Sequence, residues 1–129
     1  MRSATVCVPI TRDEDFNNPN IVKVVRARNG RALYFSRSPI PYPRNDAGCA
    51  VWEHLGIYAF TKQFLLKFVA LPPTPLMQTE SLEQLRILEH GYSMAVIPTK
   101  YPSEGPNVNT LEDLEEARRI FAQKKNEEK

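Results

Sequence analysis

The sequence predicts a mixed α/β fold in which at least part of the sheet is antiparallel. Two runs rich in β-branched residues flank Asn29-Gly30, and Asn-Gly between two such runs is the strongest short-range signal for a β-hairpin. Other strand-like runs alternate with segments whose apolar residues recur at helical spacing. Apolar residues make up 42% and charged residues 25% of the 129 residues, as in ordinary globular proteins. We therefore expect residues 1–129 to form a single domain with its own core.

The predicted strands are short and are separated by strong turn signals. The hairpin pairs Ile21–Arg28 with Arg31–Phe35 around Asn29-Gly30. The polar stretch Asp13–Asn20 ends in a turn, and Ser38–Gly48, which holds three prolines, is expected to be an extended loop. The remaining strands are predicted at Thr5–Ile10, Glu53–Phe60 and Tyr92–Pro98.

Helices are expected to flank this sheet. The first covers Thr61–Val69, where Phe64 and Phe68 are four residues apart, and the prolines after Leu71 end it. The second begins with Thr74 as its cap and Pro75 at its first position and runs as one helix to Gly91. After a loop over 100–109, a final helix is predicted with one apolar face formed by Leu111, Leu114, Ala117, Ile120 and Phe121.

Composition excludes several classes of partner and site. A formal net charge of +2 is too small to predict binding to nucleic acid or to an anionic membrane. No apolar run approaches the roughly 20 residues of a membrane span. The two cysteines, Cys7 and Cys49, lack the spacing of metal ligands, so we expect free thiols in a reducing cytoplasm.

The sequence contains no phosphate-binding loop, dinucleotide-binding, zinc-protease or nucleophile-elbow motif. Several polar residues nevertheless follow or face apolar elements. Arg37 directly follows an apolar strand, and His54 and Tyr58, four apart in a predicted strand, should point to one face. Glu80, Glu83 and Gln84 lie three and four apart, so on one helix they would form a polar stripe.

These residue types suit a polyhydroxylated sugar acid as ligand. An arginine fork can bind a carboxylate, and a Glu-Gln pair offers acceptors and donors to hydroxyl groups. Each residue also has a simpler interpretation. Arg37 can form a surface ion pair, His54 can be a hydrogen-bonded strand histidine, and Glu83 with Gln84 can be a solvated helix face.

Five blocks, in order, resemble the C-terminal half of the CMP-Kdo synthetases (3-deoxy-manno-octulosonate cytidylyltransferases). The third block matches the family's ALYFSR segment, the fourth its H-(I/L)-G-I-Y segment, and the fifth its helix ending in LEQLR. The five blocks are Thr5–Ile10, Asn18–Val25, Ala32–Pro41, His54–Tyr58 and Pro75–Arg86.

The resemblance implies part of a Rossmann-like sheet of the nucleotide-diphospho-sugar-transferase type. It also implies transfer of CMP from CTP to Kdo with Mg²⁺, for lipopolysaccharide biosynthesis, and a homodimer. Carried onto matching positions, it implies that Arg37 holds the sugar carboxylate, that His54 and Tyr58 line the pocket, and that Glu83 and Gln84 bind hydroxyls. No catalytic residue is assigned within this chain.

The family's nucleotide-binding N-terminal half has no counterpart in this sequence. Neither its R-x-x-S-x-R-L-P-G-K loop, which holds the CTP phosphates, nor its QGDEP block is present. Asn109 stands where the resemblance places an aspartate that binds Mg²⁺, and a neutral amide should weaken such a site. We therefore expect no cytidylyltransferase activity from this chain alone, and CTP binding only beside a partner chain.

Three alternatives stay open at this point. The chain can be the sugar-binding half of a split cytidylyltransferase. It can instead be a non-enzymatic remnant or regulatory module that dimerises or pairs with a full-length synthetase. Thirdly, it can belong to an enzyme that acts on a different 2-keto sugar acid.

Overall fold

A computed structural model describes residues 2–99, 111–112, 114–115, 118–119 and 122 of the chain. Over these residues it has the predicted α/β class, with a five-stranded sheet in the order β3-β2-β4-β1-β5. The strands are β1 (Ser3–Pro9), β2 (Lys23–Arg26), β3 (Ala32–Ser36), β4 (Trp52–Phe60) and β5 (Ala95–Pro98). The helices are α1 (Asp13–Phe16), α2 (Lys62–Ala70), α3 (Pro75–Glu80) and α4 (Leu85–Glu89).

The hairpin prediction is confirmed. β2 and β3 pair antiparallel, and the turn between them places Gly30 at φ 88°, a left-handed conformation that glycine adopts without steric cost. The paired segments are shorter than the predicted runs, because β2 starts only at Lys23. β1 and β5 are parallel neighbours, so the sheet is mixed.

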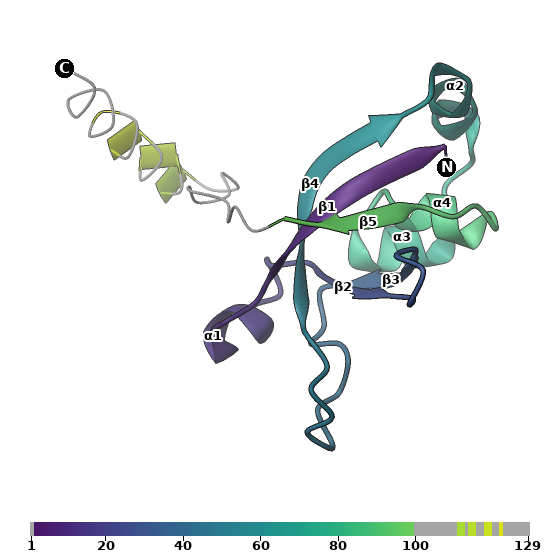
Figure 1. Cartoon of the computed structure of the whole chain (residues 1–129). Helices are drawn as coiled ribbons and strands as arrows, with labels where there is room; N and C mark the ends of the chain where they lie inside the picture. Colours follow the sequence, from purple (N-terminus) through teal and green to yellow (C-terminus); the bar gives the residue numbers. More distant parts are fainter. Residues whose placement is uncertain (1, 100–110, 113, 116–117, 120–121, 123–129) are drawn as a thin grey trace.

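The sheet curls until its two edge strands meet at one corner. The Val96 N–H donates to the Gly30 carbonyl at 2.8 Å, and the Ala32 N–H donates to the Met94 carbonyl at 2.9 Å. β5 therefore has β1 on one side and the start of β3 on the other. Figure 1 shows α3 and α4 lying together on one side of this curled sheet, near β3.

The core lies between the sheet and these helices. Burying one such aliphatic or aromatic side chain contributes roughly 1.5–3 kcal/mol, so this cluster is the main driving force for closing the helices onto the sheet. It contains side chains from β1, β2, β3 and β5, from α2 and α4, and from the segments just before α4 and β5. Its members are Cys7, Val24, Phe35, Phe64, Leu82, Leu85, Ile87, Met94 and Val96.

The prediction of one helix from Thr74 to Gly91 is wrong. α3 ends at Ser81, which adopts φ 54° and ψ 48°, and α4 starts only at Leu85. The reversal places Leu82 in the core, where it is 5% exposed, so apolar burial explains the break. Glu83 and Gln84 then lie in the turn between the helices, and the predicted stripe of Glu80, Glu83 and Gln84 along one helix does not exist.

The helix starts agree with the sequence in position and differ in one detail. Thr61 caps α2 by accepting the Phe64 N–H at 3.2 Å. Pro75 occupies the first turn of α3 and Thr74 its cap position, but the Thr74 side chain makes no cap hydrogen bond. The Glu89 carboxylate of α4 accepts the Leu76 N–H at 3.2 Å instead, which ties the two helices together.

One short element was missed by sequence reasoning. Asp13–Phe16 forms α1 within the stretch that was expected to be only polar chain and turn. The two thiols are both free, with Cys7 buried and Cys49 exposed. Among the described residues, no helix has the length and apolar content to cross a bilayer.

Part of the C-terminal prediction lies outside the described residues. This holds for the loop over 100–109, and therefore for Asn109. Of the predicted final helix, residues 111–112, 114–115, 118–119 and 122 are described and are helical.

Candidate functional site

A bulge in β4 brings His54 and Tyr58 to the same face of the sheet, as predicted. His54 pairs with Cys7 and Tyr58 with Thr5, while Gly56 and Ile57 lie between them without partners on β1. Because the bulge adds two residues, which is an even number, the side chains of β4 before and after it still alternate between the same two faces of the sheet. The His54 and Tyr58 rings are consequently close, with centroids 5.5 Å apart.

His54 is buried, 8% exposed, and its hydrogen bonds fix its tautomer. The Thr5 hydroxyl has one proton and lies close to two carbonyl oxygens, those of Ile57 at 2.7 Å and Leu55 at 3.1 Å, so it donates this proton to a carbonyl. It must therefore accept the bond from His54 Nε2 at 2.8 Å, so Nε2 carries the proton and Nδ1 accepts from the Gln84 amide at 3.5 Å. Burial lowers the pKa of His54 to about 4, so the ring is neutral at pH 7 and orients Gln84.

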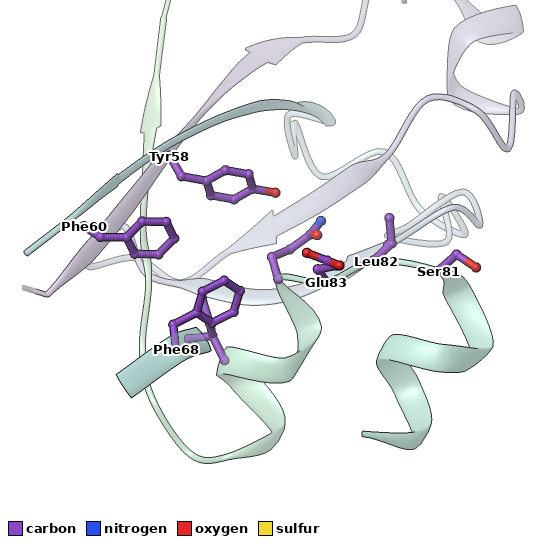
Figure 2. A pocket seen from close by; sticks show the side chains of 8 residues that line it. Tyr58, Phe60, Phe68, Ser81, Leu82 and Glu83 are labelled. Atoms are coloured by element: carbon purple, nitrogen blue, oxygen red, sulfur yellow. The ribbon is translucent and has the colours of Figure 1, made fainter. Parts of the chain in front are cut away.

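A cavity of about 300 Å³ opens beside this histidine. One wall is aromatic, because Tyr58 stacks on Phe60 at 5.9 Å and Phe60 stacks on Phe68 at 5.4 Å between ring centroids. Figure 2 shows these rings on one side and Ser81, Leu82 and Glu83 on the other. The complete lining consists of Tyr58, Phe60, Phe68, Ser81, Leu82, Glu83, Gln84 and Ile87.

Polar groups in the pocket come mainly from the turn between α3 and α4. Glu83 is exposed to solvent, whereas Gln84 is 5% exposed and is held by His54. Burial, together with the charge of Glu83, raises the pKa of Tyr58 to about 12. Tyr58 therefore keeps its proton over the physiological range and can donate a hydrogen bond to a ligand.

Arg37 lies next to this pocket and does not line it. Its guanidinium donates to three main-chain carbonyls, those of Glu80 at 2.7 Å, Pro19 at 3.0 Å and Ser81 at 3.3 Å. A guanidinium has five N–H donors, so two remain. Since Ser81 lines the pocket, Arg37 holds the pocket turn in place and keeps part of its donor capacity.

Glu80 anchors the same turn from the other side. Its carboxylate accepts the Tyr34 hydroxyl, the Ser36 hydroxyl and the Arg37 N–H, each at 2.8 Å. Burial alone would raise the pKa of Glu80, but the bonds from Arg37, Tyr34 and Ser36 outweigh it and hold the pKa below its ordinary value. Glu80 is thus an ionised link between α3 and β3.

The structure brings Tyr58, Glu83 and Gln84 together in one pocket with His54 directly behind them. Sequence reasoning did not find Phe60, Phe68 and Ser81, which also line it. Their apolar and small side chains carry no chemical signature of their own. Only the stacking of β4 on α2 reveals that Phe60 and Phe68 form a continuous wall with Tyr58.

The described residues contain no group of three His, Cys, Asp or Glu side chains that could hold a metal ion. Mg²⁺ is usually held by one or two carboxylates together with substrate phosphates, and Asn109, the position expected to face the metal, lies outside the described residues. The polar groups that line this pocket offer hydrogen bonds to a ligand.

A sequence profile of the cytidylyltransferases matches residues 1–101. This chain belongs to the cytidylyltransferase family. It is 48% identical over 119 residues to the 3-deoxy-manno-octulosonate cytidylyltransferase of Acaryochloris marina, covering 92% of this chain and 48% of that protein. It is 49% identical over 124 residues to the corresponding protein of Chloroherpeton thalassium, covering 94% of this chain and 50% of that protein.

A solved structure has the same fold. The CMP:2-keto-3-deoxy-manno-octonic acid synthetase complexed with CTP matches with a TM-score of 0.84 and 40% identity. The match covers 96% of this chain and 50% of that one. The chain thus spans about half the length of the relatives it matches, and its fold is that half of a CMP-Kdo synthetase.

Proposed function

We propose that this chain is the sugar-binding half of a 3-deoxy-manno-octulosonate cytidylyltransferase, which transfers CMP from CTP to Kdo. The observation that carries the proposal is the meeting of Tyr58, Glu83 and Gln84 in one cavity of about 300 Å³. Similarity to enzymes with that name, at 48–49% identity, supports the choice of ligand.

The two walls of the cavity suit the two kinds of surface on a sugar. Tyr58, Phe60 and Phe68 offer an apolar platform for the C–H face of the ring. Glu83 accepts hydrogen bonds from hydroxyl groups, and Tyr58 donates one. One N–H of the Gln84 side-chain amide donates to His54. The carbonyl oxygen and the second N–H of this amide therefore remain for the ligand.

The sugar carboxylate is placed on the Arg37 side of the cavity in this proposal. Glu83 carries a negative charge and would repel a carboxylate next to it. Arg37 has two N–H donors left after its three main-chain bonds, and its cationic fork suits a carboxylate. The ligand is then oriented with its acid group towards Arg37 and its hydroxyls towards Glu83 and Gln84.

Nucleotide transfer requires groups that this chain does not supply. It has no RLPGK-like loop for the CTP phosphates, and Asn109 offers an amide where a Mg²⁺-binding carboxylate is expected. We therefore propose that CTP binds only when the complementary half of the enzyme is present, and that Mg²⁺ acts there. The chain alone should be inactive.

The test compares three proteins for CMP-Kdo formation from CTP, Kdo and Mg²⁺. They are this chain, this chain fused behind the part of a relative that its alignment leaves out, and the same fusion carrying Gln84→Ala. We expect no product from the chain alone, product from the fusion, and at least a tenfold loss of kcat/KM in the variant. Product from the chain alone, or no effect of Gln84→Ala, would refute the proposal.

Two further proposals concern the oligomeric state and the cellular location of the protein. We propose a homodimer, because Leu66 and Val69, which are neighbours three residues apart on α2, are 62% and 65% exposed, and adjacent exposed apolar side chains can form an interaction patch. We also propose a cytoplasmic location, where CTP is available to a biosynthetic enzyme. Light scattering at micromolar concentration tests the first, and a clean monomer would contradict it.

A further inference from the structure

Thr5 lies behind the sugar pocket without lining it. It belongs to β1, is 2% exposed, and is not among the residues around the cavity. Its hydroxyl nevertheless contacts three groups of β4, namely His54 Nε2 at 2.8 Å and the carbonyls of Ile57 at 2.7 Å and Leu55 at 3.1 Å. A hydroxyl has one proton to donate and lone pairs to accept, so these contacts cannot all be of the same kind.

The β4 bulge decides where the hydroxyl proton goes. The register of β4 against β1 shifts directly after Thr5, and the carbonyls of Leu55 and Ile57, on either side of Gly56, both reach the hydroxyl. Carbonyls only accept hydrogen bonds, so the proton points to the bulge. The oxygen of Thr5 is left as an acceptor that faces His54 Nε2.

Packing holds the His54 ring in one position. The ring is edge-on to Phe35 with centroids 4.8 Å apart, and its centroid lies 5.5 Å from that of Tyr58. Its two nitrogens therefore stay directed at Thr5 on one side and at Gln84 on the other. With the proton on Nε2, the other nitrogen, Nδ1, carries a lone pair and can only accept.

The orientation of the Gln84 amide follows from this lone pair. A side-chain amide has a donor end and an acceptor end and can turn over to exchange them. The lone pair of His54 Nδ1 attracts the NH₂ end, at 3.5 Å, and repels the carbonyl oxygen. Gln84 lines the cavity, so its oxygen remains available to accept a hydrogen bond from a hydroxyl group of the ligand.

Loss of the Thr5 hydroxyl would remove this order. His54 Nε2 then loses its acceptor, so the ring can carry its proton on Nδ1 instead. A protonated Nδ1 donates, and the Gln84 amide must turn over to present its oxygen to the ring. The pocket would then offer the ligand two N–H donors at this position in place of an acceptor and a donor.

We infer that Thr5 is a positioning residue of the sugar pocket, which acts through the protonated Nε2 of His54 to hold the Gln84 amide with its oxygen available to a sugar hydroxyl. The inference rests on the proposed function for the identity of the ligand. It deepens that function by naming a residue outside the cavity that makes the cavity selective for a hydroxyl, since a site built for a hydroxyl discriminates strongly against ligands that lack it.

Nitrogen NMR of the histidine rings tests the first step without any ligand. The chain has two histidines, buried His54 and exposed His90, and each ring nitrogen reports whether it carries a proton. His54 should be protonated at Nε2 in the unmodified chain and in Thr5→Ser, which keeps the hydroxyl. Thr5→Val keeps the shape and removes the hydroxyl, so the form protonated at Nδ1 should become populated and the side-chain amide resonances of Gln84 should shift.

Ser3→Ala is the matched control for this comparison. Ser3 also belongs to β1, is also 2% exposed, and donates its hydroxyl proton to the carbonyl of Ser93 at 3.2 Å. Its replacement removes a buried hydroxyl but no contact with His54, so the His54 tautomer should not change. Overturning results are the same tautomer in Thr5→Val as in the unmodified chain, or an equal change in Ser3→Ala. Protonation at Nδ1 in the unmodified chain also overturns the inference, and that result decides even if Thr5→Val does not fold.

Kinetics of the fusion with the complementary part of a relative test the second step. Thr5→Val should raise the KM for Kdo roughly tenfold or more, as expected when one hydrogen bond to the ligand is lost, and should change the KM for CTP by less than about twofold. Thr5→Ser should keep the KM for Kdo within about threefold of the unmodified fusion, and Ser3→Ala should change neither constant. An equal rise of both KM values in Thr5→Val would indicate general damage to the fold and would overturn the positioning role.

The outcomes separate this inference from the proposed function. An active fusion whose KM for Kdo does not respond to Thr5→Val overturns the inference and leaves the proposed function intact. An unmodified fusion that forms no CMP-Kdo refutes the proposed function, and the tautomer comparison, which needs no ligand, then still decides whether Thr5 orients Gln84.

Discussion

Removing the Glu80 carboxylate should destabilise the chain by about 3 kcal/mol. Hydrogen bonds to a charged acceptor contribute roughly 1.5–3 kcal/mol each, and Glu80 accepts three of them. The simple sum is an upper bound, because Glu80 is only partly buried and water can replace some bonds in Glu80→Ala. Glu80→Gln keeps one acceptor oxygen and the shape, so its cost should be about 1 kcal/mol.

Urea unfolding followed by the fluorescence of Trp52, the one tryptophan in the sequence, measures both variants. With an m-value of about 2 kcal/mol/M, Glu80→Ala should lower the midpoint by about 1.5 M. Glu14→Ala is the control, because Glu14 forms only an exposed ion pair with Arg12 and should change stability by at most about 0.5 kcal/mol.

The pH dependence of the same experiment identifies the ionised carboxylate as the cause. The folded-state pKa of Glu80 lies below its ordinary value, so its contribution is complete above the ordinary glutamate pKa and is lost as the pH falls through the folded pKa. Glu80→Gln should therefore lose less stability below about pH 4.5 than the unmodified chain does. Equal stability of Glu80→Ala and Glu14→Ala, or identical acid profiles, would refute this reasoning.

Three further predictions follow from single side chains. Lys23 is completely buried and donates to the carbonyls of Asn18, Ile21 and Arg37. Lys23→Met should therefore lower the free energy of unfolding in urea by about 3 kcal/mol. A loss below about 1 kcal/mol would contradict the stabilising role of these three bonds. The His54 ring should titrate near pH 4 by NMR. Since the unfolded chain takes up that proton at its ordinary pKa, stability should fall as pH drops from about 6.5 towards 4. If the difference in unfolding free energy between the unmodified chain and His54→Gln did not change with pH, this prediction would be contradicted. Cys49 is exposed and should react with a thiol reagent in the native state. Cys7 is buried, and burial raises the pKa of its thiol, so it should not react. Equal reaction rates of the two thiols would contradict the fold.

The parts of the fold that local chemistry controls could be predicted from the sequence. The Asn29-Gly30 hairpin, the strand at Glu53–Phe60 and the start of α3 at Pro75 depend on turn geometry, alternation and fixed backbone angles. The break at Ser81 could not be predicted, because it is decided by the burial of Leu82 against distant strands.

The candidate site shows the same division. His54 and Tyr58 could be placed on one face from their spacing, and the bulge preserved that relation. Glu83 and Gln84 were expected on a helical stripe and instead reach the pocket from a turn. The main-chain bonds of Arg37 depend on where Pro19, Glu80 and Ser81 fold, which no pattern near Arg37 reveals.

The most direct test of the sugar pocket is a calorimetric titration of Kdo into this chain without CTP, repeated with Gln84→Ala, Arg37→Ala and the control Leu33→Ala. We expect saturable binding that is weakened at least tenfold by Gln84→Ala and by Arg37→Ala, and that is unchanged by Leu33→Ala. Saturable binding with equal affinity in the unmodified chain and the Gln84→Ala variant would contradict the assignment of this cavity to the sugar.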